Sequence, residues 1–389
     1  MIDVKKKYTI GIDATNLRSG GGVTHLIELL FSADPKKHCF DKVIVWGGKG
    51  CLDLIEDRSW LIKKNPSALD KSLLQRVIWQ SRKLSKAARN EGCDVLFVPG
   101  GSYSGNFRPV ITMSQNLLPF EIPELLRFGW SFLTLKFLLL RWTQSRSFIR
   151  ANGTIFLTEY ACSVVSKVTG NLIGHSCIIP HGLSPRFNKI PKIQREVSEY
   201  NGSLPYRVLY ISSVDQYKHQ WHVVDAISLL REKGLPIALD LIGPAYKPAL
   251  NRLNDRMNIV DIERNWVRYL GTISFDELHH HYARADVGVF ASSCENMPNI
   301  LLEMMASGLP IACSDRGPMP EILLGGGVYF NPEQPKDIAD AVLKLIKSVL
   351  LRSELANESH SQSQKYSWQR CADETFGFID EVIVKYKGQ

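Results

Sequence analysis

The chain has 389 residues, of which 44% are hydrophobic and 22% are charged, as in a globular protein long enough for two hydrophobic cores. We therefore expect two domains. Its eight cysteines are scattered singly, which excludes a zinc site built on paired cysteines, and no cleavable signal sequence stands at the start. These features predict a reducing, cytoplasmic setting.

Positive charge is concentrated in the first half of the chain. Residues 1–184 hold 24 Lys and Arg against 14 Asp and Glu, whereas the remainder holds 23 against 25. A basic domain attracts phosphates or an anionic bilayer, although a solvated basic surface without a partner explains the same bias. We expect no nucleic-acid partner.

Apolar strands alternate with helical stretches in both halves of the chain, which predicts α/β domains with parallel sheets. The first half opens with a strand at Tyr8–Asp13, a glycine loop at 19–22 and an amphipathic helix. After Ile179-Pro180-His181-Gly182 comes a polar stretch, and the alternation starts again at Arg207.

The segment from Ala291 to Pro310 reads as a strand, a tight loop, a helix and the start of a strand. Pro298 stands where the first turn of a helix tolerates proline. Glu295 in the loop and Glu303 in the helix can project into one cleft, where carboxylates accept strong hydrogen bonds from sugar hydroxyls. A solvated helix face is the alternative explanation for Glu303.

This segment closely resembles the Glu, seven residues, Glu motif of the family-four retaining glycosyltransferases. The resemblance implies the GT-B fold, an α/β architecture of two Rossmann-like domains facing across a cleft, with a C-terminal helix crossing back to the first domain. It implies an acceptor-binding domain at 1–184, a nucleotide-sugar domain at 185–366 and the returning helix at 367–389.

The same resemblance assigns roles to individual residues. It implies that Glu295 contacts the donor sugar, Glu303 the nucleotide ribose, and the backbone near Asn299 and Ile300 the diphosphate. Lys218 stands where the family carries a lysine that neutralises the diphosphate, whereas Ser213 replaces the usual arginine. The expected donor-binding residues are Gly21, Gly22, Ser213, Lys218, Glu295, Asn296, Met297, Pro298, Asn299, Ile300 and Glu303, with Glu295 and Lys218 as catalytic residues.

Gly21 and Gly22 let backbone N–H groups approach an anion closely, although such turns are commonly only turns. Gln115 and Asn116 stand where many relatives have His-Asp. Neither amide acts as a base, so we expect both to hydrogen-bond the donor sugar or the acceptor. His181 is a further expected cleft residue, with a purely structural role as the alternative.

The stretch 125–150 is rich in Leu, Phe and Trp, carries five basic residues and has no acidic residue. It is too interrupted to span a bilayer, but such a composition suits a helix lying in the membrane interface. A core helix of the first domain would be equally apolar. We therefore expect either peripheral contact with the inner face of the plasma membrane or a core position.

The resemblance predicts a glycosyltransferase that forms an α-glycosidic bond between a sugar from a UDP- or GDP-linked donor and a polysaccharide or lipid-linked acceptor. The histidines at 279–281 point in different directions along a helix, so we expect no metal site and no cofactor. Two alternatives stay open. A nucleotide-sugar epimerase needs no acceptor, and a non-catalytic nucleotide-sugar-binding subunit shows no turnover.

Overall fold

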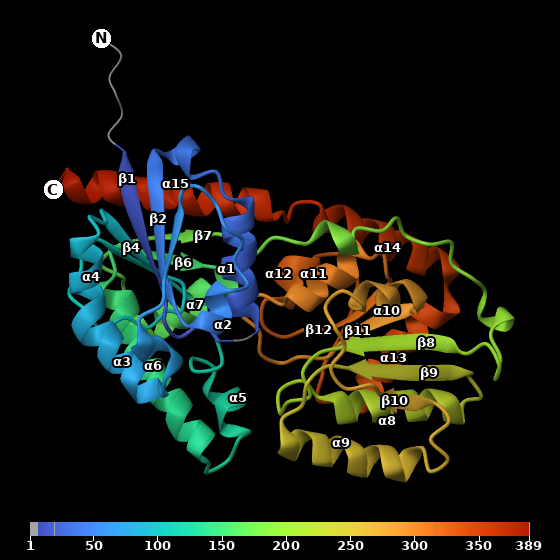
Figure 1. Ribbon diagram of the computed structural model, residues 1–389. Helices are drawn as coiled ribbons and strands as arrows, with labels where there is room; N and C mark the ends of the chain where they lie inside the picture. Colours follow the sequence, from blue (N-terminus) through green and yellow to red (C-terminus); the bar gives the residue numbers. More distant parts are fainter. Residues whose placement is uncertain (1–6, 19, 389) are drawn as a thin grey trace. The chain divides into compact units, whose positions relative to one another are not determined.

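The computed structural model describes residues 7–18 and 20–388, which form two compact α/β units (Figure 1). The first unit comprises the described residues up to Ile122, then Trp130–Gly182 and the chain from Tyr366 onward. The second unit comprises Pro123–Gly129 and Leu183–Lys365.

A seven-stranded parallel sheet in the order β3-β2-β1-β4-β5-β6-β7 forms the core of the first unit. Its central strands are buried on both faces, which explains why they read as apolar runs in the sequence. The strands are β1 (Tyr8–Ala14), β2 (Phe40–Gly47), β3 (Leu61–Lys64), β4 (Val95–Val98), β5 (Val110–Met113), β6 (Gly153–Phe156) and β7 (His175–Ile178).

The last helix of the chain, α15, packs on α1 within this first unit, as the resemblance implied. A Cβ added at Gly153 of β6 would lie 3.0 Å from side-chain atoms of Phe378 and Val382, so the helix lies directly on the sheet. The helices of this unit are α1 (Gly21–Ser32), α2 (Lys49–Leu52), α3 (Leu73–Trp79), a π-helical turn (Gln80–Leu84), α4 (Ser85–Asn90), α6 (Phe132–Arg150), α7 (Glu159–Thr169) and α15 (Trp368–Lys387).

The second unit has a six-stranded parallel sheet in the order β10-β9-β8-β11-β12-β13. Its strands are β8 (Tyr206–Ile211), β9 (Ile237–Ile242), β10 (Val267–Tyr269), β11 (Val287–Phe290), β12 (Ile311–Ser314) and β13 (Val328–Phe330). Its helices are α8 (Gln220–Glu232), α9 (Lys247–Val260), α10 (Leu278–Arg284), α11 (Asn299–Ala306), α12 (Met319–Leu323), α13 (Pro335–Lys347) and α14 (Val349–Ser363).

Residues 123–129 group with the second unit, whereas we expected them in the first domain. This short segment contains most of α5 (Ile122–Leu126). Its side chains find their partners in the second unit, because Ser293 Oγ donates to Glu124 Oε2 at 2.6 Å and Arg127 forms an ion pair with Glu333 at 2.7 Å. The stretch 125–150 is therefore divided between two units rather than forming one element.

Both sheets reverse their strand order at the first strand of the unit, between β1 and β4 and between β8 and β11. Open α/β sheets bind ligands outside the carboxyl ends of the strands at such a reversal. The loops that follow β8 and β11 are therefore the first place to look for a site in the second unit.

Candidate active site

Lys218 and Glu295 meet at the strand reversal of the second sheet. Lys218 lies in the loop after β8 and Glu295 in the loop after β11, and Lys218 Nζ forms an ion pair with Glu295 Oε1. The two side chains are only 7% and 15% exposed. Lys218 Nζ also lies 5.1 Å from the ring centroid of Tyr217, so both loops and an aromatic wall hold the ammonium in place.

The two loops are joined by hydrogen bonds that the sequence did not reveal. Ser293 N donates to Tyr217 O at 2.8 Å, and Ser293 Oγ lies 2.9 Å from His219 Nε2. Burial lowers the pKa of His219 to about 3, so this imidazole is neutral and acts as a hydrogen-bonding group. Because His219 follows Lys218 and Ser293 precedes Glu295 by two positions, this connection positions the ion pair.

Glu124 adds a third partner to this junction from a distant part of the sequence. Its carboxylate accepts from Ser293 Oγ and also pairs with Arg127 at 2.7 Å. The sequence contained only one signal for His219 and Ser293, which is that they lie within two positions of the predicted site residues Lys218 and Glu295. Nothing in the sequence pointed to Glu124, because it lies 169 positions from Ser293.

A helix amino terminus stands beside Glu295. Pro298 is the N-cap of α11, which begins at Asn299, so the proline directly precedes the first turn rather than lying within it as the sequence predicted. The first N–H groups of a helix have no acceptor within the helix, so those of Asn299 and Ile300 are suited to bind an anion. Asn296 and Met297 are buried in the loop before this start.

Glu303 lies in the middle of α11 and is 8% exposed, so it does not lie on a solvated helix face. Its Oε2 accepts a hydrogen bond from Tyr282 Oη at 2.9 Å. Burial raises the pKa of Glu303 to about 7, although Tyr282 and Arg186 both act to lower it. A carboxyl group with this pKa changes its charge near neutral pH.

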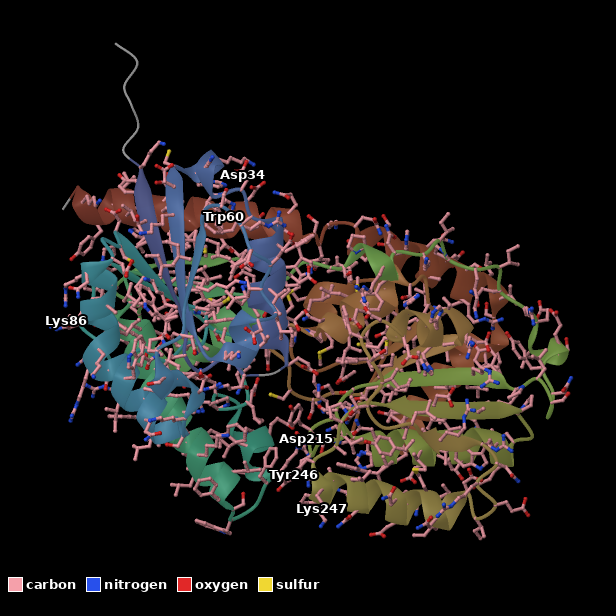
Figure 2. The ribbon with its side chains drawn as sticks, in the orientation of Figure 1. Asp34, Trp60, Lys86, Asp215, Tyr246 and Lys247 are labelled. Carbon is pink, nitrogen blue, oxygen red and sulfur yellow. The ribbon has the colours of Figure 1, made fainter. Side chains whose placement is uncertain are left out.

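Ser213 is partly buried in the loop after β8, and its carbonyl oxygen accepts from Gln220 Nε2 at 2.8 Å. This loop also bonds to the loop after β9, since Tyr246 N donates to Val214 O at 2.9 Å. Figure 2 shows Asp215 and Tyr246 close together on these two loops. Ser213 brings no charge to the site, so Lys218 is the predicted cation that the structure places there.

The glycine loop and Gln115 come together in the first unit. Ser19 lies outside the described residues, and Gly20 takes a left-handed φ of 72° as the N-cap of α1. A Cβ added at Gly22 would lie 2.9 Å from Gln115 Oε1, so the absence of a side chain lets Gln115 lie against this loop. Gly21 is the exposed first residue of α1.

Asn116 is exposed, and its Oδ1 accepts from Leu118 N at 3.1 Å, which stabilises the turn after β5. His181 is buried in the first unit, where its Nδ1 lies 2.9 Å from Nδ1 of His25 and its ring lies 5.8 Å from that of Trp368. These contacts favour the structural alternative for His181.

The buried histidine pair makes the first unit sensitive to acid. Burial lowers the pKa of His181 to about 4 and that of His25 well below 6.5. Between pH 6.5 and about 4 the unfolded chain binds more protons than the folded protein, so the free energy of unfolding decreases as pH decreases. Each histidine contributes up to about 1.4 kcal/mol per pH unit to this decrease. We expect urea midpoints measured at pH 7 and pH 5 to differ less in His181→Gln than in the parent protein.

Exposed His175 of β7 provides the control for this prediction. His175→Gln should keep the full pH dependence of the parent protein. An unchanged difference in the His181→Gln variant would contradict the assignment of a neutral, buried imidazole at this position.

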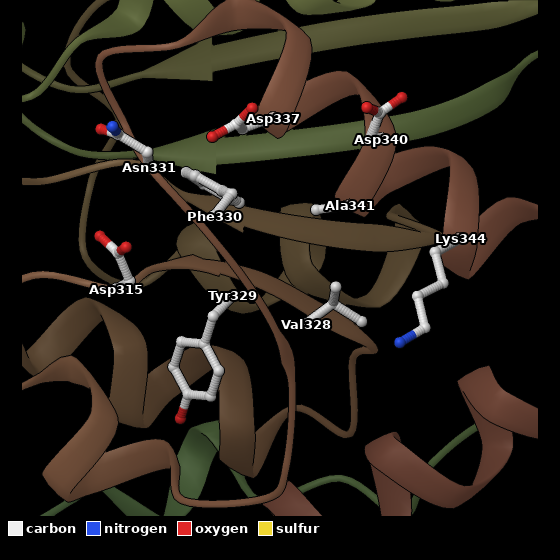
Figure 3. A pocket seen from close by; sticks show the side chains of 9 residues that line it. All are labelled: Asp315, Val328, Tyr329, Phe330, Asn331, Asp337, Asp340, Ala341 and Lys344. Carbon is white, nitrogen blue, oxygen red and sulfur yellow. The ribbon is translucent and has the colours of Figure 1, made fainter.

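A hollow of about 490 Å³ lies elsewhere in the second unit, between β13 and α13. Figure 3 shows Asp337, Asp340 and Lys344 on the helix and Tyr329 on the strand. None of the predicted site residues lines this hollow. Among the described residues, no cluster of three or more His, Cys, Asp and Glu is placed to hold a metal ion.

Comparison with known proteins connects this geometry to a family. Residues 205–348, which include Lys218, Glu295 and Glu303, match the family described as Glycosyl transferases group 1. The chain is also 28% identical over 110 residues to the O-antigen chain mannosyltransferase B of Escherichia coli. That match covers 28% of this chain and 29% of the relative, so the chain spans less than a third of this curated relative's length.

Solved structures match almost the whole chain. Sucrose-phosphate synthase from Thermosynechococcus elongatus superposes with a TM-score of 0.75 at 15% identity, covering 97% of this chain and 100% of that one. Anabaena HepE in complex with UDP-glucose superposes with a TM-score of 0.71 at 16% identity, covering 96% and 100%. The chain therefore has the GT-B fold, and its residues 205–348 are the part that is similar to the group 1 glycosyl transferases.

Proposed function

We propose that this protein is a retaining glycosyltransferase that moves a hexose from a UDP- or GDP-linked donor to a polysaccharide or lipid-linked oligosaccharide acceptor. The observation that carries this proposal is the meeting of Lys218, Glu295 and the start of α11 at the strand reversal of the second sheet. One ammonium and one helix amino terminus suit a diphosphate, and one carboxylate suits a sugar hydroxyl.

In the proposed reaction, the bond between the anomeric carbon and the diphosphate oxygen breaks while the acceptor oxygen bonds to the same face of that carbon. The acceptor hydroxyl gives its proton to the leaving diphosphate, so no protein base is needed. Lys218 and the N–H groups of Asn299 and Ile300 stabilise the negative charge that develops. Glu295 fixes the sugar, and Glu303 binds the ribose.

The same groups make a metal unnecessary in this proposal. A lysine ammonium has three N–H donors, so Lys218 can keep Glu295 as a partner and still donate to a phosphate oxygen. Gln115 and the glycine loop of α1 are proposed to assist at the donor sugar or the acceptor, since they lie together in the first unit.

The names of the similar proteins support the substrate classes in this proposal. The Escherichia coli relative is an O-antigen chain mannosyltransferase, which favours assembly of a cell-surface polysaccharide. The Anabaena structure contains UDP-glucose, which favours a nucleotide sugar as donor.

Purified protein exposed to a panel of UDP- and GDP-sugars tests the proposal. A donor that binds the folded state raises its melting temperature, and the proposal requires nucleotide release from that donor to depend on a glycan or lipid-linked acceptor. Conversion of the donor without acceptor would instead show an epimerase. Stabilisation without any turnover would show a nucleotide-sugar-binding subunit.

We further propose that α6 attaches the first unit to the inner face of the plasma membrane. Among the described residues, no helix is long and apolar enough to cross a bilayer. Yet α6 directs mainly polar side chains inward, whereas large apolar ones face solvent at helical spacing. The exposed set on α6 is Phe132, Leu135, Leu138, Leu139 and Trp142, and the exposed Trp130 lies just before the helix.

Basic residues accompany this exposed apolar stripe, since α6 carries Lys136, Arg141, Arg146 and Arg150 and no acidic residue. Apolar and basic side chains together bind the interface of anionic bilayers. We expect the triple variant Leu135→Ser, Lys136→Glu and Leu139→Ser to lose at least about tenfold in affinity for anionic liposomes. Burial of each leucine side chain in lipid contributes a free energy of about 1.5–3 kcal/mol. Binding of the soluble donor should not change.

The control for this experiment alters a similar exposed set in the second unit: Ile259→Ser, Ile262→Ser and Lys233→Glu. This control variant should sediment with liposomes to the same extent as the parent protein. Equal sedimentation of the α6 variant and the parent protein would remove α6 from the membrane contact.

A further inference from the structure

A second cavity in the second unit has a lining that is rich in arginine. It measures about 370 Å³ and lies between α10 and one face of β8, β9 and β10. None of its residues belongs to the candidate active site. It is lined by Arg207, Val208, Leu209, Asp240, Arg268, Leu270, His281, Arg284 and Ala285.

Three arginines and one carboxylate, that of Asp240, line this cavity. Arg268 holds Asp240 with two hydrogen bonds of 2.7 and 2.8 Å, one to each carboxylate oxygen. Arg207 lies 3.8 Å from the same carboxylate, and Arg284 makes no ion pair with any described residue. The nearby Asp286 is occupied by the backbone N–H of Arg207 and by other partners.

The backbone places these cations on a rigid frame. Register pairs Leu209 with Asp240 and Asp240 with Arg268, so the three side chains stand in a row on one face of the sheet. Arg284 approaches from α10 above this row. Arg207 of β8 and Arg284 of α10 add guanidinium groups beyond the one that pairs with Asp240, and such a surplus suits an anion that accepts forked hydrogen bonds.

We propose that this cavity binds a small phosphate-bearing anion, with Arg207 and Arg284 as its main ligands. The volume is that of a site for a small molecule, and the open lining is polar. Phosphate binds guanidinium groups in a bidentate manner, and Arg268 remains committed to Asp240.

The cavity is connected to Glu303 through α10. His281 and Arg284 of this helix line the cavity, and Tyr282 between them is fully buried and donates to Glu303 Oε2. An anion that binds Arg284 near the sheet shifts the helix turn that also contains Tyr282. The anion should therefore alter nucleotide binding, and this second step depends on the proposed ribose-binding role of Glu303.

Calorimetric titration with inorganic phosphate, in a buffer without other multivalent anions, tests the binding step. The double variant Arg207→Gln and Arg284→Gln should bind phosphate at least about tenfold more weakly than the parent protein. Exposed Lys233→Gln, which removes one charge from the same unit, should bind within about twofold of the parent.

Lys218→Ala distinguishes this cavity from the candidate active site, because it should leave phosphate binding here intact. Loss of phosphate binding in Lys218→Ala with retention in the arginine variant would overturn the proposal, as would the absence of binding to the parent protein at about 10 mM phosphate.

Titration with UDP in the presence and absence of phosphate tests the coupling step. Phosphate should change the Kd of UDP at least about threefold in the parent protein and not in Tyr282→Phe, which should still bind phosphate. The same Kd of UDP with and without phosphate would overturn the coupling. Failure of both UDP and GDP to bind would contradict the proposed function, whereas the result of the phosphate titration would remain valid.

Discussion

Lys218→Ala is expected to lower kcat by about two to three orders of magnitude, while affinity for the nucleotide sugar falls by less. The ammonium lies at the strand reversal, where the proposal places the leaving diphosphate. Its charge matters most when the bond to the diphosphate breaks, so its loss acts more on the transition state than on the bound donor. Steady-state kinetics together with calorimetry of donor binding give the two numbers.

A double variant separates this effect from a structural one. Lys218→Ala leaves the Glu295 carboxylate without its cation, and an unpaired buried charge is itself destabilising. Glu295→Gln in the Lys218→Ala background removes that charge, so the free energy of unfolding should recover toward that of the parent protein while turnover stays low. Equal losses in kcat and in donor affinity would reduce Lys218 to a simple binding residue.

Lys233→Ala is the matched control for Lys218→Ala. Lys233 is exposed and follows the last residue of α8, a helix of 13 residues that begins near Lys218 and so extends about 20 Å away from it. Its removal should change neither kcat nor donor affinity.

Glu303→Ala is expected to weaken nucleotide-sugar binding by about 1.5–3 kcal/mol, the range for a hydrogen bond to a charged group. Glu303 also supplies the acceptor for the buried hydroxyl of Tyr282, so the alanine variant loses stability as well. Glu303→Gln keeps a hydrogen-bond acceptor for Tyr282, so it measures the effect of losing the negative charge alone. Binding of the alanine variant within about twofold of the parent protein would contradict the ribose assignment.

The raised pKa of Glu303 gives this assignment a pH signature. Ribose hydroxyls donate to the ionised carboxylate, so binding favours the deprotonated form. With a pKa of about 7 in the free protein, donor affinity should rise as pH increases from 6 to 8 and then level off, by up to about tenfold. The donor affinity of Glu303→Gln should not change between pH 6 and pH 8. The same pH dependence in both proteins would assign the effect to another titrating group.

The fold could be predicted because its signals are local. Buried parallel strands such as β4 and β11 are apolar along their whole length, and Pro298 fixes the start of α11. The grouping of residues 123–129 with the second unit could not be predicted this way. Nothing in the sequence around Glu124 and Arg127 indicates their partners Ser293 and Glu333, which only tertiary contacts supply.

The sequence predicted residue types for the candidate site but not the pairs that these residues form. Glu295 and Glu303 follow from one continuous motif, whereas the Lys218–Glu295 ion pair joins residues 77 positions apart. His219 and Ser293 gave no signal of their own, because a histidine and a serine in loops are most often solvated. His181 shows the opposite case, since a histidine in a hinge sequence proved to be buried against His25.

The stereochemistry of the product tests the central claim most directly. NMR of the glycoside formed from an α-linked nucleotide sugar reports the configuration at the anomeric carbon through its proton coupling. Same-face attack, with the diphosphate held by Lys218 and the start of α11 as proton acceptor, predicts an α-glycoside. A β-glycoside from the same donor would contradict retention and the roles assigned here to Lys218 and Glu295.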